Sequence, residues 1–157
     1  MRRIFRKTLA AAGLSLAASA AAAEKNFEMF TPDDAKRFVE TYKAAPIVRA
    51  GDFLYISGVV AGLRPDDEPT PDAYEAAMRV AFERIGRALG AAGASWDNVV
   101  EMTTFHVGMR DHQEIAVGVR EDFVGEAPYP TWTAIGVEKL WADDLFLEIR
   151  VTAYLGE

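Results

Sequence analysis

LFLEIRVTAY, residues 145–154, is the segment that decides the fold. Successive side chains of a β-strand point to opposite faces of its sheet. Here one set of alternate residues is wholly aliphatic, while the other mixes aromatic, charged and hydroxyl side chains. The aliphatic set is therefore expected to pack against helices, and the amphiphilic set to form the opposite face. The aliphatic set is Leu145, Leu147, Ile149, Val151 and Ala153. The amphiphilic set is Phe146, Glu148, Arg150, Thr152 and Tyr154.

Two helices are predicted before this strand. Thr70-Pro71-Asp72 has the form of a helix start, and apolar residues then recur every three or four positions until Gly90. A second helix should begin at Asp111, with Asp111 and Glu114 as a capping box, and run to about Phe123. The apolar stripe of the first helix comprises Tyr74, Ala77, Met78, Ala81, Ile85, Ala88 and Leu89.

The remaining apolar runs are typical of strands. They are residues 47–50, 53–57, 98–107 and 131–137, and a loop is expected over 58–68. The resulting order, ββαβαββ, predicts an α+β fold with a single sheet and two helices on one face. Two helices cannot cover both faces, and Phe146 and Tyr154 would share the open face. We therefore expect an oligomer that associates through this face.

The chain divides into three parts. Residues 1–23 have a basic start, an alanine-rich apolar run and small residues at the end, which is typical of a cleaved signal peptide; Arg2-Arg3 also fits a twin-arginine signal. Residues 24–45 form a polar N-terminal extension with a short helix starting near Thr31, and residues 46–157 form the domain. The pattern predicts a periplasmic or secreted protein with no membrane association after processing.

Composition limits the chemistry. The chain has no cysteine and two histidines, so thiol chemistry is excluded and neither a metal site nor a cofactor is expected. His106 is expected at a strand edge or packed, and His112 in solvent; neither is assigned to catalysis. The net charge is −7, and removal of residues 1–23 leaves 13 basic against 24 acidic residues, a net charge of −11. Such a chain repels phosphate backbones, so nucleic-acid binding is not expected.

Several motifs in sequence order carry a resemblance to a known family. They are Phe53-Leu54-Tyr55-Ile56-Ser57-Gly58, Arg84-Ile85 through Ala91-Ala92-Gly93, Trp96-Asp97-Asn98-Val99-Val100, and Tyr129-Pro130-Thr131-Trp132-Thr133-Ala134 followed by Leu147-Glu148-Ile149. Together they resemble the Rid family (RidA/YjgF-like imine and enamine deaminases). The resemblance implies a chorismate-mutase-like fold and a homotrimer with small-molecule clefts between subunits. It also implies that an arginine binds the substrate carboxylate and that a glutamate orients water.

The resemblance carries the glutamate over to Glu148, as the candidate catalytic residue. A partly desolvated carboxylate there would activate water, or it would make a structural hydrogen bond or ion pair with Arg150 or a neighbouring subunit. The arginine does not carry over, because Trp132 stands in its place. An indole cannot form the bidentate ionic contact of an arginine. Trp132 is expected either to pack or to offer a platform to a planar or cationic ligand.

Other positions also depart from the family pattern. Ile47, Val59 and Ala116 replace an aromatic residue, a glutamine and an asparagine, which makes the cleft less polar. With Gly58, Trp132, Thr133 and Arg150 they complete the candidate substrate-binding set. We therefore expect a small-molecule ligand, with hydrolysis of an imine, enamine or related C–N compound but not of standard amino-acid-derived imines. The alternatives are a trimer that binds a small molecule without turnover and a protein-interaction trimer.

Overall fold

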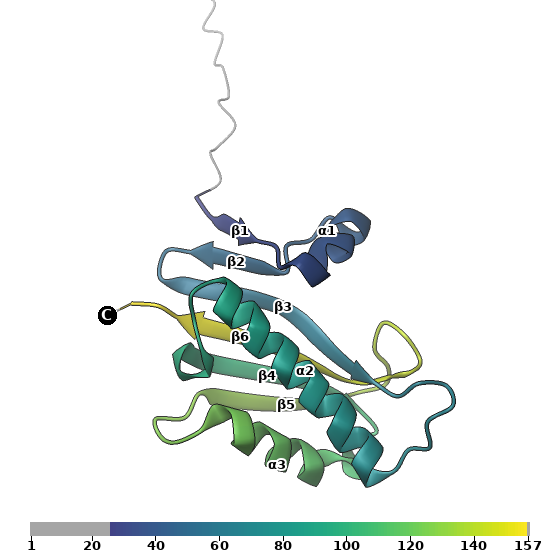
Figure 1. Ribbon diagram of the computed structural model, residues 1–157. Helices are drawn as coiled ribbons and strands as arrows, with labels where there is room; N and C mark the ends of the chain where they lie inside the picture. Colours follow the sequence, from purple (N-terminus) through teal and green to yellow (C-terminus); the bar gives the residue numbers. More distant parts are fainter. Residues whose placement is uncertain (1–25, 157) are drawn as a thin grey trace, which may run out of the picture.

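The computed structural model describes residues 26–156, and the predicted signal peptide lies outside the described residues. The described chain forms one mixed sheet with helices on one side (Figure 1). The strands are β1 (Glu28–Phe30), β2 (Ile47–Ala50), β3 (Phe53–Gly62), β4 (Val99–Val107), β5 (Thr131–Val137) and β6 (Leu145–Tyr154). The helices are α1 (Lys36–Tyr42), α2 (Pro71–Ala91) and α3 (Gln113–Val124), with 3₁₀ turns η1 (Asp33–Ala35), η2 (Trp96–Asn98) and η3 (Met109–Asp111).

The strand order is β1-β2-β3-β6-β4-β5. Every neighbouring pair is antiparallel except β4 and β5, which are parallel because α3 connects them. The helices α2 and α3 cross the same face of the sheet (Figure 1). The predicted α+β class, with two main helices on one face of a single sheet, is confirmed. The short strand β1 and the third helix α1 both come from the N-terminal extension.

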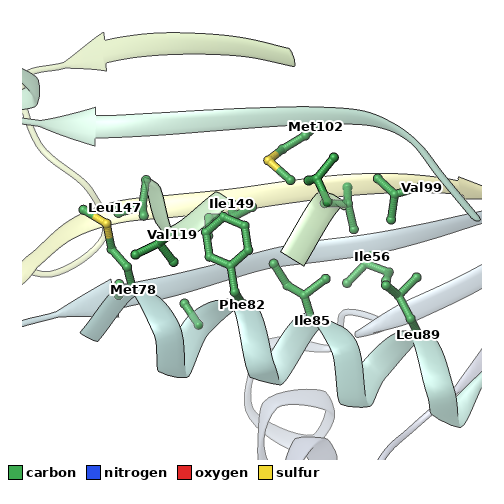
Figure 2. Packing of buried hydrophobic residues seen from close by; sticks show 14 of the residues in the cluster. Ile56, Met78, Phe82, Ile85, Leu89, Val99, Met102, Val119, Leu147 and Ile149 are labelled. Carbon is green, nitrogen blue, oxygen red and sulfur yellow. The ribbon is translucent and has the colours of Figure 1, made fainter. Parts of the chain in front are cut away.

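The core lies between α2 and the sheet. The Thr70 hydroxyl accepts a hydrogen bond from the backbone N–H of Ala73 and caps the helix, with Pro71 in the first turn, as predicted. Figure 2 shows the α2 side chains pointing toward the strands. The predicted stripe omitted Phe82, which is 2% exposed and packs on Trp96 and Phe123 at ring-centroid distances of 5.5 and 5.2 Å. The buried residues of α2 are Met78, Ala81, Phe82, Ile85 and Leu89.

Three local expectations were wrong. β3 does not end at Ser57 but runs to Gly62, because a bulge between Ile56 and Val59 lets the strand continue beside β6. Asp111 does not cap α3; it ends the turn η3, and His112 is the residue before the helix. In the N-terminal extension Pro32, not Thr31, precedes the first helical turn.

The aromatic ring of Phe146 also lies on the opposite side from the one predicted. The pairing of β3 with β6 shifts between Ala61 and Gly62, which breaks the alternation at the start of β6. Phe146 is consequently buried against Tyr74 of α2 and against His112, with ring centroids 4.8 and 5.1 Å apart. From Leu147 onward the predicted alternation holds.

The face of the sheet away from the helices remains amphiphilic without Phe146. Phe53, Tyr55, Ile135 and Tyr154 are each about two-fifths exposed on this face. The register places Phe53 opposite Tyr154, with ring centroids 5.1 Å apart, and Ile135 beside Phe105. Such a surface still favours association through this face. Within residues 26–156, no helix is long and apolar enough to cross a membrane.

Candidate functional site

Glu148 and Arg150 lie on the amphiphilic sheet face. Glu148 on β6 is level with Val60 of β3 and Phe105 of β4, and Arg150 is level with Thr103. Neither side chain forms a hydrogen bond or an ion pair within residues 26–156, so the alternative of a Glu148–Arg150 pair inside one chain is not realised. A partly buried carboxylate without a bonding partner is available to water or to a ligand.

Gly58 creates the space that Glu148 occupies. It lies in the bulge of β3, and a Cβ atom at this position would overlap the Glu148 carboxylate. The bulge thus places the backbone of β3 against the candidate catalytic group. Any larger residue at position 58 would displace the Glu148 side chain.

Trp132 lies on the other face of the sheet. In the parallel ladder it is level with Met102, a fully buried residue on the helix side, and the Arg120 guanidinium of α3 stacks over its ring. Trp132, Ala116, His106 and Ala134 line a cavity of about 280 Å³ between α3 and β5. Thr133, the next residue along β5, points to the amphiphilic face beside Thr103, and Thr103 is also level with Arg150. One chain therefore holds Trp132 and Glu148 on opposite faces.

The remaining predicted residues lie near β3. Gly58 and Val59 line a cavity of about 310 Å³ between α1, α2 and β3, together with Arg84 and Arg87. Ile47 was predicted to contact the ligand, but it pairs with Ile56 on the helix side and is 0% exposed, so a ligand cannot reach it. The predicted residues thus form two separate groups: Gly58, Val59, Glu148 and Arg150 around β3 and β6, with Thr133 on the same sheet face as Glu148, and Ala116 and Trp132 on the helix side around α3 and β5.

Sequence reasoning missed a buried polar chain behind Trp132. The Trp132 Nε1–H donates to Thr104 Oγ1 at 3.0 Å, and His106 Nε2 lies 2.8 Å from the same hydroxyl. His106 Nδ1 lies 3.1 Å from His112 Nε2, and the two rings stack. Both histidines are at most 2% exposed, so the expectation of a solvent-facing His112 was wrong. Alternation along β4 could have placed His106 inside with Thr104, but nothing in the sequence pairs it with His112.

The hydrogen bonds constrain the tautomers of the two histidines. If the Thr104 hydroxyl donates to His106 Nε2, then His106 Nδ1–H donates to His112 Nε2, and His112 carries its proton on Nδ1. That Nδ1 atom is buried without a partner in the described chain. Burial lowers the pKa of His106 to about 4, with a further contribution from His112, and burial also lowers the pKa of His112, partly offset by Asp111. Both rings are therefore neutral at pH 7.

The buried histidines should make the fold acid-sensitive. The unfolded chain binds a proton at His106 near its ordinary pKa of 6.5, whereas the native chain does so only near pH 4. Stability is therefore complete above pH 6.5 and falls as the pH drops toward 4. We expect the free energy of unfolding to decrease by about 2 kcal/mol between pH 7.5 and pH 5, since one pKa unit corresponds to about 1.4 kcal/mol. Urea unfolding at fixed protein concentration measures this.

A variant provides the control for this pH dependence. His106→Phe removes one of the two buried titrating rings, so its stability should change less than that of the parent between pH 7.5 and pH 5, with the remaining change due to His112. Equal pH dependence in the variant and the parent would show that other groups are responsible.

No group of three or more histidine, aspartate or glutamate side chains comes together in the described chain in a way that could hold a metal ion. The site offers instead one carboxylate without a partner on the amphiphilic face and one guanidinium-covered indole on the helix side. These groups suit the binding of a small organic molecule and, at Glu148, the activation of water.

The fold and the site define a small α+β protein with candidate ligand-binding residues on both faces of its sheet. Residues 34–155 match the sequence model of the endoribonuclease L-PSP family, and the chain belongs to this family, also known as YjgF/RidA/UK114. The RutC family protein YjgH of Escherichia coli is 37% identical over 116 residues, which cover 74% of this chain and 84% of that protein. The RutC family protein PH0854 of Pyrococcus horikoshii is 28% identical over 131 residues, which cover 81% of this chain and 97% of that protein.

Solved structures agree with this assignment. The structure of protein YJGH superposes with a TM-score of 0.69 at 31% identity, covering 85% of this chain and 99% of that one. A probable translation initiation inhibitor from Rhodopseudomonas palustris superposes with a TM-score of 0.66 at 26% identity, covering 83% and 99%. The resemblance to the Rid family predicted from the sequence motifs is confirmed, and the fold agrees with the chorismate-mutase-like architecture expected for that family.

Proposed function

We propose that this protein is a homotrimer that binds a small molecule in clefts between its subunits and hydrolyses a C=N or related C–N bond there. The observation that carries the proposal is the division of the site into two groups on one chain. Glu148 with Gly58 lies on one part of the surface, and Trp132 with Ala116 on another. Because β5 is an edge strand of the sheet, packing of the amphiphilic face of one subunit along the β5 edge of the next would bring the first group of one subunit near the second group of the next.

Glu148 would supply the chemistry. Its carboxylate makes no bond within the described chain and lies against the backbone of Gly58, where it can accept a proton from water attacking an electrophilic carbon. The hydroxyls of Thr103 and Thr133 lie on the same face and would order the water or the leaving nitrogen. The product of an imine would be a carbonyl compound and ammonia.

Ribonuclease activity, suggested by the name of the family, is not proposed. The chain carries a net charge of −7, and both histidines are buried and neutral. An acidic surface disfavours RNA, and no histidine is accessible to transfer protons to its phosphodiester.

A second candidate is a trimer that binds its ligand without turnover. It is favoured by the Trp132 N–H, which is already bonded to Thr104, and by the Arg120 guanidinium, which covers the ring. Both features describe a rigid binding wall. Ligand-dependent ammonia release separates the two candidates: it should be detectable with the parent protein and lost in Glu148→Gln, because an amide cannot act as a base at neutral pH. Binding without ammonia release would favour the second candidate.

The trimer is the first prediction to test. Multi-angle light scattering at micromolar concentration should give three times the mass of the processed chain. Replacing Ile135 by lysine would put a charge on the amphiphilic face at its β5 edge, beside Phe105, and should shift the assembly toward monomers. The matched control is Val80→Lys on α2, where an equally apolar side chain is 51% exposed on the helix side. A monomeric parent protein would contradict the proposal.

We also propose export to the periplasm or the medium with cleavage near Ala23, from the order of basic, apolar and small residues in 1–23. The N-terminal sequence of the soluble protein tests this proposal, and recovery of an intact Met1 from the cytosol would contradict it. Unchanged export after replacing Arg2-Arg3 by two lysines would exclude the twin-arginine route.

A further inference from the structure

The cavity at Trp132 carries a charge in one place only. Most of its lining side chains are apolar. His106 also lines it, but this ring is neutral and both of its nitrogens are already hydrogen-bonded. The charged lining residue is Glu114, which is exposed in the first turn of α3 beside Gln113. The walls of this cavity therefore offer a ligand one carboxylate and no positive charge.

Glu114 is free to contact a ligand. Its carboxylate forms no hydrogen bond or ion pair within residues 26–156. An acidic residue in the first turn of a helix also interacts with the helix dipole, which explains a carboxylate at this position but not its place in a cavity wall. Small-molecule sites typically combine apolar walls with a few polar groups that orient the ligand. Glu114 is the group of this kind in the Trp132 cavity.

Arg120 limits what Trp132 can bind. The guanidinium carbon lies 4.8 Å from the centroid of the Trp132 ring, so the indole already has a cation on its π-system. Arg120 is not among the residues that line the cavity. A second cation stacked on the same ring would be repelled by the first. A ligand can therefore place an apolar body against the indole, but its positive charge has to be held elsewhere.

We infer that the cavity binds a monocation with an apolar body, and that Glu114 is the ligand-binding residue that holds the charged nitrogen. The apolar body lies against Trp132, Met109 and Val117. The net charge of −7 supports this assignment, since an acidic protein attracts cations and repels anions. The inference rests on the proposed C=N hydrolysis and names its substrate class, which is a protonated imine without a carboxylate.

The chemistry of this substrate class is balanced by water alone. Water adds to the carbon of RCH=NH₂⁺ while Glu148 accepts a proton from it. The proton then moves to the nitrogen and the C–N bond breaks, so that the products are the aldehyde RCHO and NH₄⁺. Imines of this kind arise by two-electron oxidation of primary amines. A separate amine-oxidising reaction therefore has to supply the substrate.

Three probes of similar size test the charge preference. They are 2-phenylethylamine, 2-phenylethanol and phenylacetate, which are cationic, neutral and anionic at pH 7.5. Isothermal titration of the assembled protein should show the ammonium binding about fivefold tighter than the alcohol, which corresponds to about 1 kcal/mol, the upper end for an exposed ion pair. Phenylacetate should bind most weakly. The preference for the ammonium should also decrease at high salt.

Variants assign the preference to one residue. Glu114→Gln should abolish it, and Glu114→Asp, which keeps the charge on a shorter side chain, should retain part of it. The matched control is Glu83→Gln, an equal loss of charge at an exposed position of α2, which should leave the preference unchanged. A helix-stabilising role alone would lower the stability of Glu114→Gln without changing which probe binds tighter.

Several results would overturn the inference. They are equal binding of ammonium and alcohol by the parent trimer, tighter binding of phenylacetate, no binding of any probe, and a preference that survives in a folded Glu114→Gln. If Glu114→Gln does not fold, Glu114→Asp and the salt dependence decide, and a preference that responds to neither overturns the inference.

A turnover assay separates this inference from the proposed function. An amine oxidase generates the imine of 2-phenylethylamine, and ammonia release is followed with the parent protein and with Glu148→Gln. Acceleration by the parent without the binding preference leaves the proposed function standing and overturns the inference. The binding preference without acceleration contradicts hydrolysis and leaves the inferred ligand class standing.

Discussion

Hydrolysis of 2-aminoacrylate or 2-iminobutyrate should be no faster with this protein than without it. In the family site implied by the sequence resemblance, an arginine on β5 binds the carboxylate of such imines, and here Trp132 occupies that position. Removing one partner of a buried charge pair costs roughly 2–5 kcal/mol. The expected loss is therefore about thirtyfold to several-thousandfold in binding of the reacting imine. The assay generates the imine with a separate amino-acid-metabolising enzyme and follows keto-acid formation.

Variants at position 132 provide the controls for this assay. Trp132→Arg should restore part of the activity, and only part, because Val59 and Ala116 also make the site less polar than the family pattern. Trp132→Phe removes the N–H without adding a charge and should restore nothing. Parent activity comparable to that of an arginine-bearing relative would contradict the argument. It would then point to another guanidinium, and Arg120→Gln and Arg150→Gln would show which one.

Arg150 belongs to the predicted substrate-binding set but is poorly placed to replace the missing arginine. Arg150 lies two residues after Glu148 in the sequence, so alternation along the strand puts a positive charge on the same face as the Glu148 carboxylate. The structure puts both residues on the amphiphilic face, whereas Trp132 lies on the helix side. Arg120 lies next to Trp132 but is separated from it by 12 positions in sequence and belongs to a helix, so no motif connects the two. A contact between a helix and an edge strand depends on packing, which periodicity does not encode.

The strands β5 and β6 were predicted to the residue, because apolar alternation and flanking turns define them. The prediction ended β3 too early. A bulge is a change of register between two strands, and within the β3 sequence only Gly58 indicates it. The same limitation explains Phe146, which follows strict alternation in sequence but sits at a register shift. Phe82 was overlooked because it is adjacent in sequence to Ala81; at the centre of a helix packed against both a sheet and another helix, the buried stripe is wider than a simple repeat.

The sequence could nominate single positions for the candidate site, but not the partners that packing brings to them. Glu148, Gly58 and Trp132 remain predicted site residues, and the structure gives each a defined environment. Ile47 is too buried for the predicted ligand contact, because the sequence alone does not show which face of β2 its side chain takes. His112 was expected in solvent because a polar side chain usually lies outside, yet the hydrogen-bonded chain through His106, Thr104 and Trp132 makes its burial possible. Such partners come from different strands, and no single stretch of sequence contains them.

Thr104→Val should destabilise the fold by about 2–4 kcal/mol, the second large effect that the structure predicts. Thr104 is 3% exposed, and its hydroxyl is the one group that joins Trp132 Nε1–H to His106 Nε2. Valine has nearly the same shape but leaves both nitrogens without their partner, and each unsatisfied buried polar group costs about 1–3 kcal/mol. Because Trp132 is partly exposed, its N–H can turn to water, which keeps the sum below the maximum. Urea unfolding at pH 7.5 measures the loss.

Thr104→Ser is the matched control, because it keeps the hydroxyl and removes only a methyl group, worth about 1 kcal/mol. If the hydroxyl matters, the serine variant should lie much closer to the parent than the valine variant, and only the valine variant should change the fluorescence of Trp132. A valine variant as stable as the serine variant would contradict the role given to this hydrogen bond.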